Sequence, residues 1–304
     1  MKRRNSTITD VAIIGAGITG ALTAWFSARA GLATTLIERG EIGGQASSTN
    51  PGGLNPLHGP GIPGPMGDLA LHAFRLHKNN WEAIAEHARI NFSPRQISRI
   101  QLLQDGDAED SGADIVDLYE GTEGFSARFL DRKELISEEP RLNPEISRGI
   151  LLHGNARVDA HAYTQAVTEA AISFGTVVQH DSVVGMDNDR ARVTELTLGS
   201  GHNLNCHAVV VATGPWVSQV AEWFRFALPV EPVKGQLLKA RIPGGIKHDL
   251  ILGRAAIYPF SGDVVCIGGT AENVGFDTSP KEAGLIPLAI VPPLMPTPYP
   301  VSPT

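Results

Sequence analysis

Residues 8–20 read ITDVAIIGAGITG, a largely β-branched and apolar run that passes directly into three glycines. Such a run is typical of a strand that is buried on both faces of a parallel sheet. Residues 21–30 then carry an alanine-rich helical pattern that ends before Gly31, and residues 33–37 are expected to form a second strand. A strand–turn–helix–strand unit of this kind closes with a right-handed crossover. The segment therefore predicts an α/β domain built on a parallel sheet.

The turn has the spacing Gly15-x-Gly17-x-x-Gly20, the fingerprint of a dinucleotide-binding fold. The first glycine allows a tight turn, the second lets the backbone approach a pyrophosphate, and the third lets helix and strand pack closely. Glu38 ends the second strand, where a carboxylate can bind the ribose hydroxyls of an adenosine. The structural alternative is a glycine turn that only joins strand and helix. The fingerprint itself does not choose between NAD and FAD.

A loop is expected over residues 40–67, and its part 43–54 reads GGQASSTNPGGL. A long loop inside a compact domain is usually functional. Small residues with hydroxyls and free amides can wrap a pyrophosphate and a flavin, so this loop favours FAD. Ordinary turn chemistry explains Ser47, Ser48 and Asn50 equally well.

The rest of the chain alternates between helical and strand patterns. Helices are expected over residues 68–87, 131–138 and 160–174, and strands over 97–103, 115–119, 207–212, 233–240, 250–258 and 263–268. We expect a Rossmann-like nucleotide-binding domain from residues 8–90 and 146–224. A second, mostly antiparallel β domain is expected from residues 91–145 and 225–282. Residues 283–304 are rich in proline and are expected to be a disordered tail.

Composition excludes several classes of protein. The chain has 304 residues and a formal net charge of -7, so it repels a phosphate backbone and we expect no nucleic-acid partner. No run of apolar residues is long enough for a membrane span. The 2 cysteines do not form a disulfide scaffold, which favours the cytoplasm. The 10 histidines lack ligand spacing, and we expect no metal.

Several further motifs share one order along the chain. They are Gly15–Gly20, Glu38-Arg39, the loop from Gly44 to Leu54, Arg157-Val158-Asp159, residues 209–216 (VVVATGPW), residues 232–236 (PVKGQ) and residues 267–272 (IGGTAE). In this order they resemble the FAD-dependent family of D-amino-acid oxidases and glycine oxidases. The resemblance covers roughly residues 8–285.

The resemblance implies a role in FAD binding for a set of positions. Gly15, Ala16, Gly17 and Gly20 form the pyrophosphate turn, Glu38 binds ribose, and Arg39 lies beside it. The other positions that match the cofactor-binding pattern are Ser47, Ser48, Gly52, Gly53, Leu54, Val183, Thr213 and Gly214. Val183 matches a backbone contact to adenine, and a core valine is an equally good interpretation.

The resemblance also implies the reaction, oxidation of a small amine or amino acid. The flavin accepts a hydride from the carbon beside nitrogen, and oxygen or another acceptor reoxidises it. In glycine-oxidase relatives a tyrosine precedes the proline matched by Pro259, but Ala256 stands at that position. Tyr258 is two residues on and shares its face of the strand. We therefore take Tyr258 and Arg254 as candidate substrate-binding residues, with an edge tyrosine and a solvated arginine as the alternatives.

Two other functions stay open at this point. The family's carboxylate-binding arginine lies in a Gly-x-Arg-Pro-like segment beyond the position of Thr270, and this sequence has no such segment. We therefore expect a C-terminally truncated member that turns over amino acids poorly. The alternatives are a non-catalytic FAD-binding remnant and an NAD-linked dehydrogenase.

Overall fold

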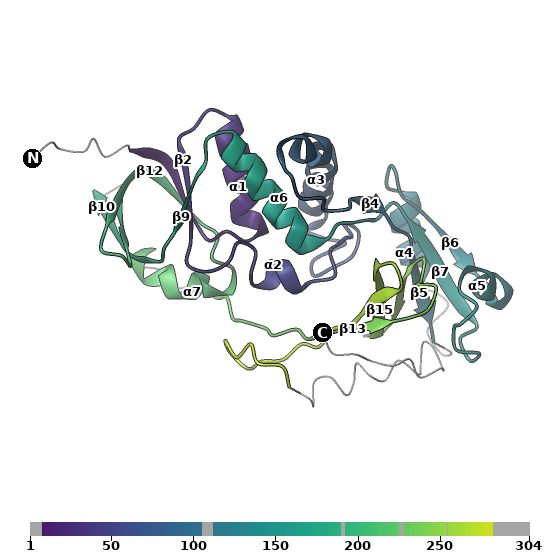
Figure 1. Cartoon of the computed structure of the whole chain (residues 1–304). Helices are drawn as coiled ribbons and strands as arrows, with labels where there is room; N and C mark the ends of the chain where they lie inside the picture. Colours follow the sequence, from purple (N-terminus) through teal and green to yellow (C-terminus); the bar gives the residue numbers. More distant parts are fainter. Residues whose placement is uncertain (1–7, 105–111, 190–191, 225–227, 254, 282–304) are drawn as a thin grey trace, which may run out of the picture. The chain divides into compact units, whose positions relative to one another are not determined.

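The structure is a computed structural model that describes residues 8–104, 112–189, 192–224, 228–253 and 255–281 (Figure 1). Arg254 and the proline-rich segment 283–304 lie outside the described residues. The chain divides into two compact units. The first comprises the described parts of Met1–Asn50, Asn80–Phe92 and Ala160–Pro232, and the second those of Pro51–Asn79, Ser93–Asp159 and Val233–Thr304. The boundaries differ from those expected, because residues 51–79 and 146–159 group with the second unit.

The first unit contains a six-stranded sheet in the order β10-β11-β12-β1-β2-β9. Its strands are β1 (Thr9–Ile14), β2 (Thr34–Glu38), β9 (Val177–His180), β10 (Val183–Asp189), β11 (Arg192–Leu198) and β12 (Asn203–Val211). Strands β12, β1, β2 and β9 are parallel, whereas β10 and β11 form an antiparallel extension. The parallel βαβ unit expected at the N-terminus is therefore confirmed.

Helices of the first unit pack through small side chains. They are α1 (Ile18–Arg29), α2 (Ala46–Thr49), α6 (Ala160–Ser173) and α7 (Val217–Val220), with 3-10 turns η2 (Gly214–Trp216) and η3 (Ala221–Phe224). Along α1, Ala21, Ala24 and Ala28 recur at helical spacing and are buried. Helix α6 contacts α1 and is also alanine-rich on its buried side. Helix α3 (Gly67–His87) crosses the boundary between the two units.

The second unit contains a seven-stranded sheet in the order β13-β16-β15-β14-β5-β7-β6. Its strands are β5 (Arg99–Leu103), β6 (Ser126–Leu130), β7 (Arg148–His153), β13 (Leu237–Arg241), β14 (Asp249–Leu252), β15 (Ala255–Ser261) and β16 (Val264–Gly268). All pairs are antiparallel except β14 with β5. A small antiparallel sheet has the order β3-β8-β4, formed by β3 (Gly53–Leu54), β8 (Ala156–Arg157) and β4 (Arg95–Gln96).

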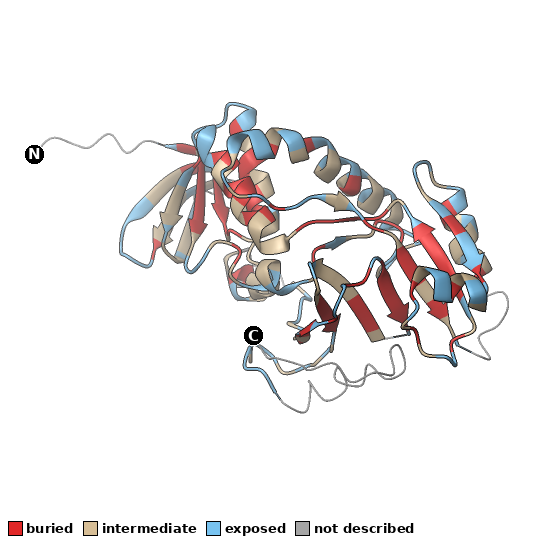
Figure 2. Ribbon diagram, turned by 45° about the vertical axis from the view of Figure 1, so that its right-hand side comes forward, coloured by how far each residue is buried: buried red, intermediate tan, exposed pale blue. Residues whose placement is uncertain are grey.

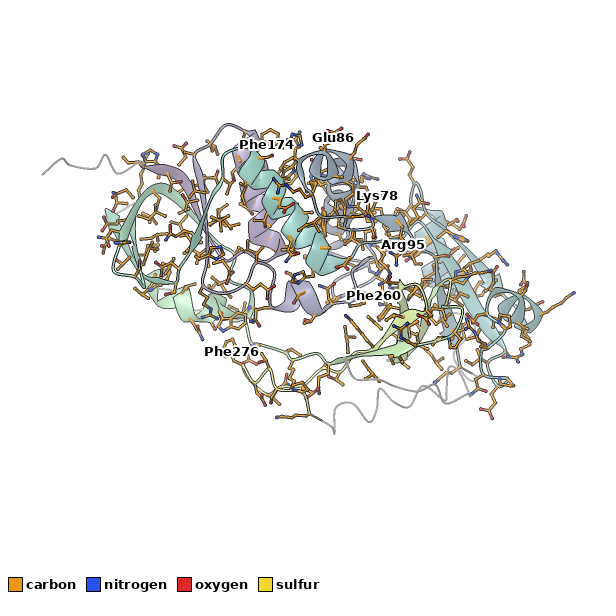
Figure 3. All side chains as sticks on the ribbon, in the orientation of Figure 1. Lys78, Glu86, Arg95, Phe174, Phe260 and Phe276 are labelled. Atoms are coloured by element: carbon orange, nitrogen blue, oxygen red, sulfur yellow. The ribbon has the colours of Figure 1, made fainter. Side chains whose placement is uncertain are left out.

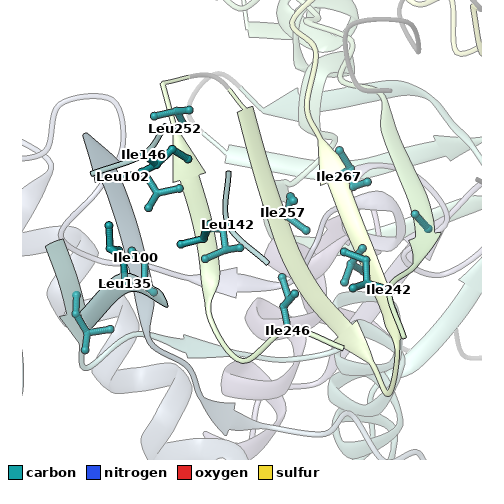
Figure 4. Close-up of a cluster of buried hydrophobic side chains, with 14 of the residues drawn as sticks. Ile100, Leu102, Leu135, Leu142, Ile146, Ile242, Ile246, Leu252, Ile257 and Ile267 are labelled. Carbon is teal, nitrogen blue, oxygen red and sulfur yellow. The ribbon is translucent and has the colours of Figure 1, made fainter. Parts of the chain in front are cut away.

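One face of the seven-stranded sheet is the apolar core of this unit. Ile100, Leu252, Ile257 and Ile267 are at most 7% exposed. They lie on the neighbouring strands β5, β14, β15 and β16 (Figure 4). Helix α5 (Arg132–Glu138) adds the buried Leu135 to this core. In each unit, buried residues recur along the strands (Figure 2). The mostly antiparallel second sheet is therefore confirmed.

Three local expectations were wrong. Residues 115–119 form no strand but lie in helix α4 (Ala113–Glu120). The expected loop 40–67 contains α2 and β3, and the expected strand 250–258 is divided into β14 and β15 at a hairpin. Strands β6 and β7 were not foreseen. Among the described helices, none has the length and apolar character that crossing a membrane requires.

Candidate functional site

The glycine turn between β1 and α1 is packed too closely for side chains at two of its positions. Gly15 has φ of +101°, and a Cβ atom there would lie 2.6 Å from the carbonyl oxygen of Ala212 at the end of β12. A Cβ atom on Gly20 would lie 1.9 Å from the carbonyl oxygen of Gly15. These two glycines therefore allow the first turn of α1 to pack directly against the ends of β1 and β12.

Gly17 differs, because the protein leaves room in front of it. A Cβ atom there would meet only the Oγ atom of Ser47, at 3.3 Å. Its φ of -70° and ψ of 177° are open to any residue. The protein's own packing therefore does not explain a glycine at this position, whereas a ligand lying against the turn does.

The N-terminus of α1 is capped from another segment. Its N-cap residue, Gly17, has no side chain, and the N–H of Ile18 donates to Ser47 Oγ at 3.0 Å. Ser48 acts locally instead, since its hydroxyl donates to the carbonyl of Gln45 at 2.9 Å. Ser47 therefore lies at the glycine turn, while the Ser48 side chain is held by turn chemistry. The contacts of both residues with FAD stay a prediction.

Glu38 is fixed beside the same turn. Its Oε2 atom accepts the backbone N–H of Ala16 and its Oε1 atom accepts that of Gly40, each at 2.8 Å. A carboxylate offers about four lone-pair sites. Both oxygens therefore keep acceptor capacity for the hydroxyls of a ribose, and the backbone bonds hold the group in one orientation.

The segment after β12 borders the turn. A Cβ atom on Gly15 would lie 3.3 Å from Cα of Thr213. The Thr213 Oγ1 atom is buried and has no hydrogen-bond partner among the described residues, which suits a polar ligand. Gly214 has φ of +55° and open space where a side chain would lie. The donor set and the open positions together fit a dinucleotide.

Arg39 and Val183 lie at the margin of this group. The guanidinium carbon of Arg39 lies 5.0 Å from the ring centroid of Trp216, a cation–π contact. Val183 pairs with Leu198 in β10 and β11 and packs against the apolar cluster that includes Ile14. The core interpretation of its side chain is thus correct, and its backbone contact with adenine stays a prediction.

Gly52, Gly53 and Leu54 belong to the second unit. The N–H of Val158 donates to the Gly52 carbonyl at 3.0 Å, and Gly53 and Leu54 pair with β8. Gly52 has φ of +80°. The predicted set is therefore divided: the glycine turn, Glu38, Ser47 and Thr213 are brought together in the first unit, and the 52–54 loop is anchored in the second.

Tyr258 lies in β15 on the face opposite the apolar core. Its neighbour Ile257 points into that core, and Ala256 shares the face of Tyr258. The ring centroid of Tyr258 lies 5.4 Å from the guanidinium carbon of Arg157. Burial raises the pKa of Tyr258, so its phenol stays protonated near neutral pH. The expected shared face is confirmed, and the role of Tyr258 toward substrate stays a prediction.

Beneath Tyr258 lies a buried charged cluster that the sequence analysis missed. Asp249 is fully buried and bonds the guanidinium of Arg157, which is 1% exposed. Arg99 lies 3.7 Å from the other oxygen of Asp249 and is 3% exposed. Arg95 is partly buried nearby, and burial together with Arg157 lowers its pKa. The signal that could have found the cluster is a charge that begins an otherwise apolar strand, in RIQLL and DLIL.

Comparison with known proteins identifies the family. A family model described as FAD dependent oxidoreductase matches residues 10–289. A glycine oxidase of Geobacillus kaustophilus is 27% identical over 286 residues, covering 92% of this chain and 74% of that protein. A D-amino acid dehydrogenase of Xanthobacter autotrophicus is 25% identical over 329 residues, covering 90% of this chain and 77% of its own length.

A solved structure shares the fold. The crystal structure of glycine oxidase from Geobacillus kaustophilus superposes with a TM-score of 0.87 at 25% identity, over 95% of this chain and 78% of that one. The chain belongs to the DAO family of FAD-dependent oxidoreductases. It is therefore an oxidoreductase and its cofactor is FAD, so the interpretation as an NAD-linked dehydrogenase was wrong.

Proposed function

We propose that this chain oxidises a small amine or amino acid at the carbon beside its nitrogen. The observation that carries the proposal is the family match over residues 10–289 together with a glycine turn that fits a dinucleotide. The chain is similar to a glycine oxidase and to a D-amino acid dehydrogenase, and the names of both relatives state a substrate of this kind. Such relatives support amino acids as the first substrates to test.

In this proposal the first unit holds the adenosine end of the cofactor. Gly15 and Gly20 keep the turn tight, Gly17 leaves room for pyrophosphate, and Glu38 accepts the ribose hydroxyls. Ser47 fixes the N-terminus of α1, whose dipole favours the phosphate charge. When bound, FAD supplies the acceptor for a hydride.

The second unit supplies the substrate side. Tyr258 presents a neutral phenol, which can donate a hydrogen bond to a carboxylate, and Arg157 stacks on its ring. Arg157 is buried and Tyr258 is partly buried, so the interactions of both groups are stronger than at the surface. Arg254 remains a second candidate by sequence, outside the described residues.

Flavin reduction without oxygen tests the proposal directly. The chain is purified, saturated with FAD, and mixed anaerobically with glycine, sarcosine, D-alanine or D-proline while the flavin absorbance is followed. We expect bleaching by at least one of them, and no bleaching by any amine or amino acid contradicts the function. Readmitting oxygen, or adding a quinone instead, then shows which acceptor reoxidises the flavin. Until then oxygen, other acceptors and a cytoplasmic location stay predictions.

A tyrosine variant tests the site within this function. Tyr258→Phe removes the phenol hydroxyl and should slow flavin reduction at low substrate concentration by at least about tenfold, the loss of one hydrogen bond to a charged group. Tyr119→Phe is the matched control, because Tyr119 is a buried tyrosine of the same unit whose hydroxyl bonds Asn155 at 3.3 Å. Equal rates in both variants would remove Tyr258 from the substrate site.

A further inference from the structure

A cavity of about 130 Å³ lies between helix α4 and the seven-stranded sheet, and all of its lining residues belong to the second unit. We call it the α4 cavity. Ile115, Leu118 and Tyr119 of α4 form one wall, because residues three and four apart lie on the same side of a helix. Arg99 of β5 and Leu152 of β7 form the facing wall. The cavity is therefore built from two rigid elements that face each other.

The alternation of β5 brings an arginine to this cavity. Ile100 and Leu102 point into the apolar core on one face of the sheet, so Arg99 and Gln101 point to the other face. Leu152 lies opposite Arg99 in the register of β5 and β7. The loop 57–63 supplies a third side. A charged side chain is thereby placed among apolar walls.

The α4 cavity has a buried side and an exposed rim. Arg99 is 3% exposed and Tyr119 is 1% exposed, and both lie on the buried side. Asp114 and His58 are exposed and lie at the rim. A small molecule can therefore enter from solvent at the rim and reach the side chain of Arg99.

Arg99 carries more donors than its neighbours accept from. Its Nε atom is buried and has no hydrogen-bond partner among the described residues. Its Nη2 atom lies 3.7 Å from Oδ2 of Asp249, a carboxylate that also pairs with Arg157. A guanidinium has five N–H donors, and a buried charge without close partners is costly. An acceptor bound in the α4 cavity would offset this cost.

The charges on the walls favour an uncharged ligand. Arg99 contributes one cation and Asp114 one carboxylate. Partial desolvation and the charge of Arg99 lower the pKa of His58, so its imidazole is neutral near pH 7. Asp114 repels an anion and Arg99 repels a cation, whereas a hydrocarbon leaves the donors of Arg99 unmet.

The volume of the α4 cavity limits the ligand to about one ring. An apolar cavity of about 150 Å³ holds benzene, and the usual range for larger ligands begins at about 300 Å³. The face of an aromatic ring also attracts a guanidinium. We propose that the α4 cavity binds a small phenol, whose hydroxyl oxygen accepts a hydrogen bond from Arg99 and whose ring lies against Ile115, Leu118 and Leu152.

This site is separate from the candidate substrate residues. Tyr258 and Arg157 do not line the α4 cavity. Nor does Arg95, whose Nη2 atom donates to the carbonyl of Phe260 at 3.0 Å (Figure 3). The proposal therefore stands independently of the proposed function, and neither fails with the other.

Two ligands with the same ring test the proposal. Phenol carries a hydroxyl group and is uncharged at pH 7, and toluene carries a methyl group in its place. Each is titrated calorimetrically into the FAD-loaded chain at pH 7. We expect phenol to bind at least about tenfold more tightly, the worth of one hydrogen bond to a charged group. Equal binding of toluene would overturn the proposal.

Benzoate tests the charge of the ligand, because it presents the same ring with an anionic group. Phenol is titrated again with benzoate present at the dissociation constant measured for phenol. We expect the affinity for phenol to stay unchanged, since Asp114 at the rim repels the carboxylate. Displacement of phenol by benzoate at this concentration would mean that the site prefers an anion, which contradicts the proposal.

A variant that fills the cavity locates the site. Leu118→Trp places an indole ring in the space between α4 and the sheet, and it should abolish phenol binding. Leu71→Trp is the matched control, because Leu71 is a partly buried leucine that packs against the same apolar cluster but does not line the cavity. Both variants are first checked for FAD retention and for the melting temperature of the parent chain. Parental affinity for phenol in a folded Leu118→Trp variant refutes the location.

A second variant tests the role of Arg99 without relying on the first. Arg99→Met keeps a long apolar stem, removes the donors, and leaves Asp249 paired with Arg157. Phenol and toluene should then bind equally well, because the hydroxyl group has lost its partner. A preference for phenol that survives this substitution would overturn the assignment of Arg99. The comparison of phenol with toluene in the parent chain decides the proposal even where neither variant folds.

Discussion

Substituting alanine for Gly20 should destabilise the first unit whether or not FAD is present. The added Cβ would lie 1.9 Å from the Gly15 carbonyl oxygen, over 1 Å inside the 3.0 Å limit below which real Cβ contacts are essentially absent. Backbone, unlike a side-chain end, cannot swing aside, so the turn itself must move. Overpacking of this kind costs about 1–3 kcal/mol and occasionally more, and we expect the upper end.

Gly17→Val separates ligand binding from folding. Its Cβ would meet only Ser47 Oγ, at 3.3 Å, and its backbone angles suit valine. We therefore expect the variant without FAD to unfold within about 1 kcal/mol of the parent chain. It should nonetheless lose FAD on purification, because a branched side chain would stand where the pyrophosphate must approach the turn.

Thermal unfolding followed by far-UV circular dichroism measures both effects. Each chain is stripped of FAD first, since a ligand that binds only the folded state raises the melting temperature by itself. A loss of 3 kcal/mol corresponds to a fall of roughly 6–12 °C for a unit of this size. Gly67→Ala is the control, because a Cβ there meets nothing within 4 Å. A parental melting temperature for Gly20→Ala, or full FAD retention by Gly17→Val, refutes the reasoning.

Four further substitutions test other parts of the structure. Glu38→Ala should weaken FAD binding about ten- to a hundredfold in fluorescence titrations, the worth of hydrogen bonds to a charged group; an unchanged affinity removes it from the site. Asp131→Ala removes a capping box at the start of α5 and should cost about 1 kcal/mol in urea unfolding. Asp249→Ala leaves two buried arginines unpaired and should cost about 3–5 kcal/mol; a neutral result means that the cluster is hydrated. Burial lowers the pKa of His248, so the unfolded chain binds more protons and stability should fall as pH drops below about 6.5; His248→Gln should flatten that fall.

The first unit could be predicted from sequence because its determinants are local. Gly15 and Gly20 lie five residues apart and constrain each other directly, and the apolar runs on either side fix the parallel pairing of β1 with β2. Local composition is a poor guide at residues 115–119, which were expected to form a strand and lie in helix α4. The run Ile115-Val-Asp-Leu-Tyr119 has the composition of a strand, but Ile115, Leu118 and Tyr119 pack together in one cluster as helix neighbours do. Spacing decided the structure there, and composition did not.

The charged cluster of the second unit depends on pairing that no local pattern contains. Arg157 and Asp249 are 92 residues apart and meet only because β14 pairs with β5 and β8 lies beside them. Each strand nonetheless carries a trace of the cluster, since Arg99 and Asp249 face each other in the register of β5 and β14. A charge at the start of an otherwise apolar strand is expensive unless another charge meets it. When one chain contains two such strands, the charge on each strand therefore predicts a charged partner on the other. Arg157 is a second arginine at Asp249, so the cluster beside Tyr258 contains more arginines than carboxylates.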